Sequence, residues 1–311
     1  MYIFWLTRDS LELGIGEIDA LGSPKSKRLI DFVLLADSKK FNFERLAYTR
    51  SVSEFLFECS EVELEDKIAQ FDWSTIFKKE FYIRLHNTKR STVVIADLIW
   101  DKLQLPTNSK GTCVDFYFVD GKVIVGKFIC DMSHDFEHRR PKYSFAHLPT
   151  LLMPKFAKAL INLSGIQSGT LYDCFCGAGG VLVEGELFGF HVIGYDNDRG
   201  CLYRAKKNLK CHGFSNFELF EMDSTKIDHD LTYVVSDLPY GHSTKKVNLE
   251  NLFVEFCKVL ESHLLGKAVL VFPDYLDYKP LLAKTKLKLL ATYSKKESRI
   301  LTRNIIVLSR S

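Results

Sequence analysis

The sequence predicts an α/β protein in which two small α+β domains precede a larger domain built on a parallel sheet. In residues 151–311, apolar strand-like runs alternate with segments of helical spacing. Alternating β and α units give a parallel sheet with helices on both faces. The last two strand-like runs, Lys288–Ser294 and Asn304–Leu308, have no full helix between them, so we expect them to pair antiparallel. The length of 311 residues suits two or three domains.

The first 133 residues contain shorter elements, which we divide into residues 1–58 and residues 59–133. The first part predicts a strand, a helix, a strand and a helix, at Tyr2–Leu6, Leu11–Leu21, Leu29–Ala36 and Glu44–Cys59. The second part predicts a helix, a strand, a helix and a hairpin, at Val62–Phe77, Glu80–Leu85, Thr92–Leu103, Val114–Val119 and Lys122–Ile129. The hairpin is expected because Asp120-Gly121 separates its strands and the turn needs positive φ.

Residues 134–150 are polar, basic and aromatic, which predicts a linker or an ordered loop before the larger domain. An amphipathic helix then opens that domain at Met153–Leu163. The expected strands and helices follow in alternation: Thr170–Cys174, Gly180–Phe188, His191–Asp196, Arg199–His212, Phe217–Met222, Leu231–Ser236, Leu249–Leu264, Lys267–Phe272 and Leu276–Ala283.

Composition favours a cytosolic protein. Hydrophobic residues make up 46% of the chain and charged residues 26%, as in ordinary soluble proteins. No apolar run reaches the roughly 20 residues of a membrane-spanning helix, and no basic leader opens the chain. The eight cysteines form no CxxC pair or zinc spacing, so we expect reduced thiols and no metal. A net charge of +3 is weak support for a polyanionic partner.

A glycine-rich loop follows the first strand of the parallel sheet, in the segment DCFCGAGG at Asp173–Gly180. Its glycines allow a tight turn and a close approach of ligand to backbone, at the sheet edge where such ligands bind. The spacing is neither GxGxxG nor that of a phosphate-binding P-loop. It therefore favours a neutral ribose and a zwitterionic amino acid over a phosphate, while a glycine-rich turn without ligand stays open.

Acidic residues end the next two strands. Asp196 is placed to accept hydrogen bonds from both ribose hydroxyls, with Asp198 as the fallback. A helix N-cap is the alternative role, and it suits Asn197 or Asp198 better than Asp196. Asp223 is placed to accept from an adenine amino group, although a cap or loop acid is an equally good interpretation.

A second motif, DLPYG at Asp237–Gly241, ends the fourth strand. An exocyclic base amine becomes a nucleophile when acceptors on its hydrogens expose its lone pair. Asp237 and the carbonyl of Leu238 or Pro239 provide such acceptors, Pro239 fixes φ, and Tyr240 offers a flat face for a base. Together the two motifs predict methyl transfer from S-adenosyl-methionine to a base nitrogen.

The chain resembles a known family on four motifs, DCFCGAGG, YDND, MDST and DLPYG, which look like those of class I amino-methyltransferases. The segment from His138 to Asn162 resembles the junction before the catalytic domain of THUMP-containing tRNA guanine N2-methyltransferases. The archaeal-type enzyme that methylates guanine 10 is the nearest likeness. It implies a ferredoxin-like domain at 1–58, a THUMP-like RNA-binding domain at 59–133 and a Rossmann-like methyltransferase at 151–311.

The resemblance also implies site residues. Asp173, Cys176, Gly177 and Gly179 would line the methionine part of the cofactor, with Asp196 at the ribose and Asp223 at the adenine. Asp237, Pro239 and Tyr240 would hold the target guanine. Cys174 and Leu238 stand where the family usually has Pro, and Ala178 where it has Thr, so these departures bear on rate more than on reaction type.

Substrate RNA contacts are expected from basic clusters, since a stacked guanine must be turned out and remote contacts can offset that cost. The candidates are Leu238, Lys245 and Lys246 in the second motif and beyond it, Arg139, Arg140 and Lys142 in the linker, and Lys25, Lys27 and Arg28 near the N-terminus. The expected partners are tRNA and, as for some relatives, a small zinc-binding activator protein. The competing predictions are an N6-adenine methyltransferase on RNA or DNA, a glutamine methyltransferase, and a catalytically silent RNA-binding module.

Overall fold

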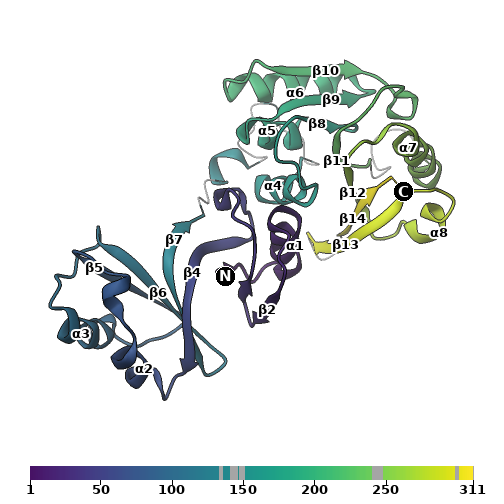
Figure 1. Ribbon diagram of the computed structural model, residues 1–311. Helices are drawn as coiled ribbons and strands as arrows, with labels where there is room; N and C mark the ends of the chain where they lie inside the picture. The colour runs from purple at the N-terminus through teal and green to yellow at the C-terminus, as the bar shows by residue number, and fades with distance from the viewer. Residues whose placement is uncertain (133–135, 141–145, 147–150, 240–247, 298–300, 311) are drawn as a thin grey trace. The chain divides into compact units, whose positions relative to one another are not determined.

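The computed structural model describes residues 1–132, 136–140, 146, 151–239, 248–297 and 301–310. The chain divides into two compact units (Figure 1). The first consists of Met1–Glu44 and Tyr48–Ser133, and the second of Arg45–Ala47 and His134–Ser311. No helix among the described residues combines the length and apolar character that crossing a membrane requires.

The second unit is built on a seven-stranded sheet in the order β10-β9-β8-β11-β12-β14-β13. The strands are β8 (Thr170–Asp173), β9 (His191–Asp196), β10 (Phe217–Glu221), β11 (Tyr233–Asp237), β12 (Lys267–Pro273), β13 (Lys288–Lys296) and β14 (Thr302–Ser309). Strands β8 to β12 are parallel, and β14 pairs antiparallel with both β12 and β13. The predicted parallel sheet with a reversed C-terminal hairpin is therefore confirmed.

Two groups of helices cover this sheet (Figure 1). The first group is α4 (Pro154–Leu163), α5 (Gly180–Leu187) and α6 (Arg199–Cys211), and the second is α7 (Leu249–His263) and α8 (Tyr278–Leu282). Successive residues of a strand face opposite sides of a sheet. Accordingly Ala268, Leu270 and Phe272 of β12 belong to the core under α7 and α8, together with Phe253 and Phe256 of α7.

The first unit has its own seven-stranded sheet, in the order β2-β3-β1-β4-β7-β6-β5. Its strands are β1 (Tyr2–Leu6), β2 (Lys27–Ile30), β3 (Val33–Ala36), β4 (Thr49–Ser60), β5 (Phe81–His86), β6 (Thr112–Val119) and β7 (Lys122–Asp131), and its helices are α1 (Leu11–Gly22), α2 (Leu64–Gln70) and α3 (Thr92–Leu103). Only β5 and β6 are parallel among these described pairs. One apolar cluster, which contains Trp73, lies under α2 and α3.

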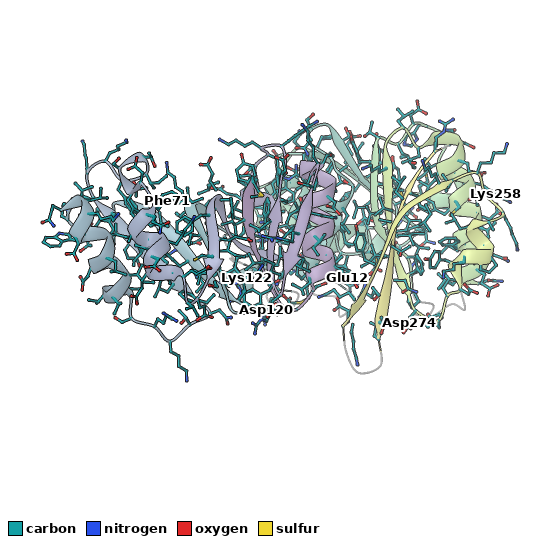
Figure 2. All side chains as sticks on the ribbon, turned by 60° about the horizontal axis from the view of Figure 1, so that its bottom comes forward. Glu12, Phe71, Asp120, Lys122, Lys258 and Asp274 are labelled. Carbon is teal, nitrogen blue, oxygen red and sulfur yellow. The ribbon has the colours of Figure 1, made fainter. Side chains whose placement is uncertain are left out.

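The predicted β6–β7 hairpin is confirmed. Asp120 and Gly121 have φ of 48° and 72°, the left-handed conformation that the turn requires. Figure 2 labels Asp120 in this turn and Lys122, where β7 begins.

Two predictions for the first unit are wrong. The helix expected at Glu44–Cys59 is strand β4, whose register shifts twice against β7, between Val52 and Ser53 and between Phe55 and Phe57. Each irregularity resets the alternation of inward and outward side chains, so the apolar spacing mimicked a helix. The strand expected at Leu29–Ala36 is the hairpin β2–β3, whose turn contains Asp31 at φ 49°. The predicted boundary at residue 58 falls inside β4, and the division into 1–58 and 59–133 stays a prediction.

Candidate active site at the carboxyl ends of the strands

The two motifs lie on neighbouring strands at the same edge of the parallel sheet. Strand β8 pairs with β9 on one side and with β11 on the other. The chain therefore leaves β8 and β11 at a point where the strand order reverses, and open α/β sheets bind their ligands in the crevice outside such a point. Asp173 pairs with Gly194 of β9, and Tyr172 pairs with Val234 of β11, so the ends of the three strands, with Asp173, Asp196 and Asp237, lie at one edge of the sheet.

The glycine-rich loop is a tight turn between β8 and α5. Its backbone is fixed by two hydrogen bonds, from Cys176 N to Tyr195 O at 2.9 Å and from Gly179 N to Cys176 O at 2.7 Å. Gly177 has φ of 51°, and a Cβ placed on it would meet no atom within 4 Å. Gly179, with φ of 83°, caps α5. Open space over Gly177 lets a ligand approach the backbone of the loop closely.

Asp173 is buried at the base of this loop. Its Oδ1 accepts a hydrogen bond from Phe175 N at 3.3 Å, and Ser236 of β11 also bonds its carboxyl group. Burial raises the pKa of Asp173 to about 7, an effect that Asp237 and Asp196 reinforce and these hydrogen bonds oppose. The Ser236 hydroxyl accepts from Cys174 N at 2.7 Å, which ties the start of the loop to β11.

Asp196 faces the glycine-rich loop. Its Oδ2 accepts from Gly177 N at 2.8 Å and its Oδ1 from Asp198 N at 2.9 Å. Burial raises its pKa, against the lowering effect of these backbone hydrogen bonds. Asp198, the fallback candidate, caps α6 by accepting from Gly200 N and Cys201 N. The cap role that the sequence suggested for Asp198 is confirmed, and Asp196 is the carboxylate that contacts the loop.

Asp223 caps the 3-10 turn η5 (Ser224–Lys226), accepting from Thr225 N at 3.0 Å and Thr225 Oγ1 at 2.7 Å. The Thr225 hydroxyl is the main cause that lowers the pKa of this exposed acid. The adjacent Ser224 hydroxyl donates to Cys174 O. The strand-end turn that carries Asp223 is therefore anchored to the glycine-rich loop.

Asp237 ends β11 and forms an ion pair with Arg303 of β14, with 2.5 Å between Oδ2 and Nη1. The side chains are 13% and 9% exposed, so the pair is largely withdrawn from water. Leu238 donates its N–H to Val271 O and buries its side chain in the core. Its backbone carbonyl is then the part of Leu238 that can face a substrate. Pro239 follows, half-buried, whereas Tyr240, Lys245 and Lys246 lie outside the described residues.

In the linker, Arg139 makes a two-pronged ion pair with buried Glu184 of α5, at 2.8 Å and 3.2 Å. It lines a cavity of about 220 Å³ beside the start of α5, together with Gly179, Gly180 and His212. Arg139 thus makes a contact within its own unit, and its role toward RNA stays a prediction. Arg140 is half-buried, and Lys142 lies outside the described residues.

Arg303 is the site residue that sequence reasoning missed. It lies 66 residues from Asp237 and meets it only because β14 runs antiparallel beside β12. The available signal was a charged residue in an otherwise apolar strand, since Ile305, Ile306, Val307 and Leu308 are all buried. A buried cation in such a strand indicates an anionic partner.

Comparison with known proteins identifies the family. Residues 141–298 match the model of the UPF0020 family, the RMKL-like methyltransferase domain. The chain belongs to this methyltransferase family. The match starts in the linker and covers both motifs of the candidate site.

Two curated relatives extend the similarity toward the N-terminus. The chain is 28% identical to a tRNA (guanine(10)-N2)-dimethyltransferase of Methanothermobacter thermautotrophicus over 283 residues, 86% of this chain and 84% of the relative. It is 26% identical to the protein of the same name from Pyrococcus abyssi over 250 residues, 76% of each chain.

Among solved structures, TrmN from Thermus thermophilus is similar over 100% of this chain and 99% of its own, with a TM-score of 0.52 and 17% identity. A possible methylase from Clostridium difficile matches with a TM-score of 0.50 and 15% identity. At this identity the likeness shows the fold, and it confirms the Rossmann-like class I methyltransferase domain that the sequence predicts. Among the described residues, no group of His, Cys, Asp or Glu is arranged to hold a metal ion.

Proposed function

We propose that this protein transfers a methyl group from S-adenosyl-methionine to the exocyclic N2 amine of a guanine in tRNA, guanine 10 by similarity to the named relatives. The observation that carries the proposal is the position of Asp237, at the carboxyl end of β11, beside the glycine-rich loop of a methyltransferase domain. The relatives named for this reaction match 84% and 76% of their own length to this chain.

The cofactor end fits S-adenosyl-methionine. The space above Gly177 admits a ligand, and Asp196 has acceptor capacity beyond its backbone hydrogen bonds, because a carboxylate offers about four lone-pair sites. We assign Gly177, Gly179, Cys176 and Asp173 to the methionine part, Asp196 to the ribose and Asp223 to the adenine. When bound, the cofactor supplies a methyl group attached to a sulfonium sulfur. After transfer of the methyl group, the rest of the cofactor leaves as a neutral thioether.

At the substrate end, Asp237 and the carbonyl of Leu238 or Pro239 accept hydrogen bonds from the two amine hydrogens. These acceptors favour the pyramidal amine and expose its lone pair. Arg303 holds one carboxylate oxygen of Asp237 and, by its charge, favours the ionised form that accepts hydrogen bonds. Pro239 fixes the backbone and Tyr240 stacks on the base.

The methylated nitrogen must lose one proton to become neutral again. Because Arg303 favours the ionised form of Asp237, we assign the final acceptance of this proton to water rather than to Asp237. Positioning and hydrogen bonding are then the protein's main contributions to the rate.

The partners follow from the same proposal. The tRNA must present a guanine turned out of its stack. The candidate RNA contacts are Arg139, Arg140, Lys142, Lys245 and Lys246. Residues 1–58 would form the ferredoxin-like domain, and residues 59–133 the THUMP-like RNA-binding domain. We place the protein in the cytoplasm with its tRNA. Binding of a small zinc-binding activator protein rests on the resemblance alone.

The proposal is tested by incubating the full chain with methyl-labelled S-adenosyl-methionine and, in parallel, unmodified tRNA, DNA and a glutamine-containing protein substrate. Nucleosides from the tRNA are then identified by mass spectrometry. We expect N2-methylguanosine or N2,N2-dimethylguanosine, and loss of the label when guanine 10 is replaced. Label in N6-methyladenosine, in DNA or in protein would instead support a competing activity, and no incorporation with any substrate would favour a silent RNA-binding module.

A further inference from the structure

Helix α6 carries a stripe of positive charge that the candidate site does not use. Its exposed residues include Arg199, Tyr203, Lys206, Lys207 and Lys210. At 3.6 residues per turn these five positions fall within an arc of about 100° on the helix surface. The opposite face contains the buried residues Ala205, Asn208 and Leu209. The charges are therefore gathered on one side of the helix.

The segment that carries the stripe is one-sided in charge. From residue 199 to residue 217 the sequence has five cations and no Asp or Glu. The whole protein has a net charge of only +3, so the rest of the chain is net negative. A cluster of cations on one helix face is the footprint expected for a polyanion.

The lysines of the stripe also differ in their partners from the basic residues near the N-terminus and in the linker. Lys27 pairs with Asp19, Arg28 with Glu58, and Arg139 with Glu184. Within the stripe Arg199 pairs with Glu221. Lys206, Lys207 and Lys210, by contrast, make no ion pair with any residue that the structure describes. The Nζ atom of Lys207 lies 4.6 Å from the centroid of the Tyr203 ring. The exposed ring of Tyr203 therefore lies among the cations.

The place of the stripe in the fold connects it to the reaction. α6 begins directly after β9, and its cap Asp198 follows Asp196, the acid at the glycine-rich loop. The stripe starts at Arg199, on the edge of the sheet that carries the candidate site, and extends about 16 Å along the helix at 1.5 Å per residue. Figure 1 shows α6 beside β9 and β10, at the outer edge of the sheet.

We propose that the exposed face of α6 binds the phosphate backbone of the substrate RNA, with Lys206, Lys207 and Lys210 as phosphate contacts and Tyr203 as a surface for an unpaired base. The inference rests on the proposed function, since it takes RNA as the substrate. An acidic protein would also suit the charge. RNA is favoured because the stripe begins at the catalytic edge and contains an exposed aromatic ring among its cations.

The test is the salt dependence of binding to an unmodified tRNA transcript. Each lost phosphate contact should reduce the slope of log Kd against log salt by about 0.7 to 0.9. The triple variant Lys206→Gln, Lys207→Gln, Lys210→Gln should therefore lower the slope by about 2 to 3 and raise Kd at least tenfold at physiological salt. Its melting temperature, its affinity for S-adenosyl-methionine and its turnover at saturating tRNA should stay near those of the wild type.

A matched control removes the same charge from another basic segment, residues 278–296, which contains six lysines and no Asp or Glu. Lys279, Lys284 and Lys288 are exposed and lie around α8 and β13, at the opposite end of the sheet from β10. Their triple Gln variant should bind the transcript like the wild type. Tyr203→Ala should raise Kd several-fold without changing the slope, because stacking carries no net charge.

A stripe variant whose slope and Kd match those of the control variant would overturn the proposal. A failure of the proposed function can be told apart from a failure of the RNA-binding proposal. If the wild type binds the transcript and loses slope in the stripe variant but transfers no methyl group, the RNA surface stands and the methylation proposal does not. A wild type that does not bind the transcript contradicts both.

Discussion

Replacing Arg303 by Ala tests the ion pair at the candidate site. Removing one partner of a buried ion pair lowers the free energy of unfolding by about 3–5 kcal/mol, because the other charge is left uncompensated. With side-chain exposures of 9% and 13%, the lower end, about 3 kcal/mol, suits this pair. Removal of this neighbouring cation also takes away the charge that favours the ionised form of Asp237. The variant should therefore lose activity most at the acidic end of the rate profile.

The assay is single-turnover methyl transfer to tRNA as a function of pH. Asp237 accepts hydrogen bonds as a carboxylate, so Arg303→Ala should lose more activity at the acidic end of the profile than near pH 8.5, relative to the wild type. Arg303→Lys keeps the charge and should restore most of the acidic limb, though less of the rate, because Lys lacks the planar fork of Arg. Arg310→Ala, which removes an exposed arginine just beyond the same strand, is the control. An unchanged rate and profile in Arg303→Ala would refute the positioning role.

Three further predictions concern other site residues. The raised pKa of Asp173, about 7, means that the folded state binds the proton more tightly than the unfolded state, so stability should fall as pH rises from about 4 to 7. Asp173→Asn should flatten that dependence in denaturant titrations, and an identical dependence would contradict the assignment. Asp196→Ala should weaken S-adenosyl-methionine about tenfold by calorimetry, the loss of two hydrogen bonds; unaltered affinity would remove it from the site. Tyr240→Ala should slow the catalytic step far more than it weakens tRNA binding, and the reverse pattern in rate and Kd would count against base stacking.

The parallel sheet and its reversed hairpin were predictable because each element of the second unit carries its own local signal. Strands β8, β9 and β11 are short apolar runs that each end in an acid, and glycine-rich or capping residues follow β8 and β9. Parallel strands bring their carboxyl ends to one edge. The neighbourhood of Asp173, Asp196 and Asp237 followed from that rule alone.

The remaining features depend on contacts between distant residues. Nothing local marks Arg303 as the partner of Asp237, because the pairing depends on the register of β14 against β12. The local sequence around Glu184 likewise does not predict its ion pair with Arg139. In β4, tertiary pairing with β7 overrode an apolar spacing that favoured a helix. Local patterns thus located the site, while its ion pairs required the three-dimensional structure.

The central claim is that Asp237 presents the target amine to the methyl donor. The direct measurement is nucleoside mass spectrometry of unmodified tRNA incubated with S-adenosyl-methionine and either the wild type or Asp237→Ala. We predict that the variant folds and binds the cofactor nearly normally, yet forms N2-methylguanosine orders of magnitude more slowly. Formation of N2-methylguanosine at the wild-type rate would contradict the account.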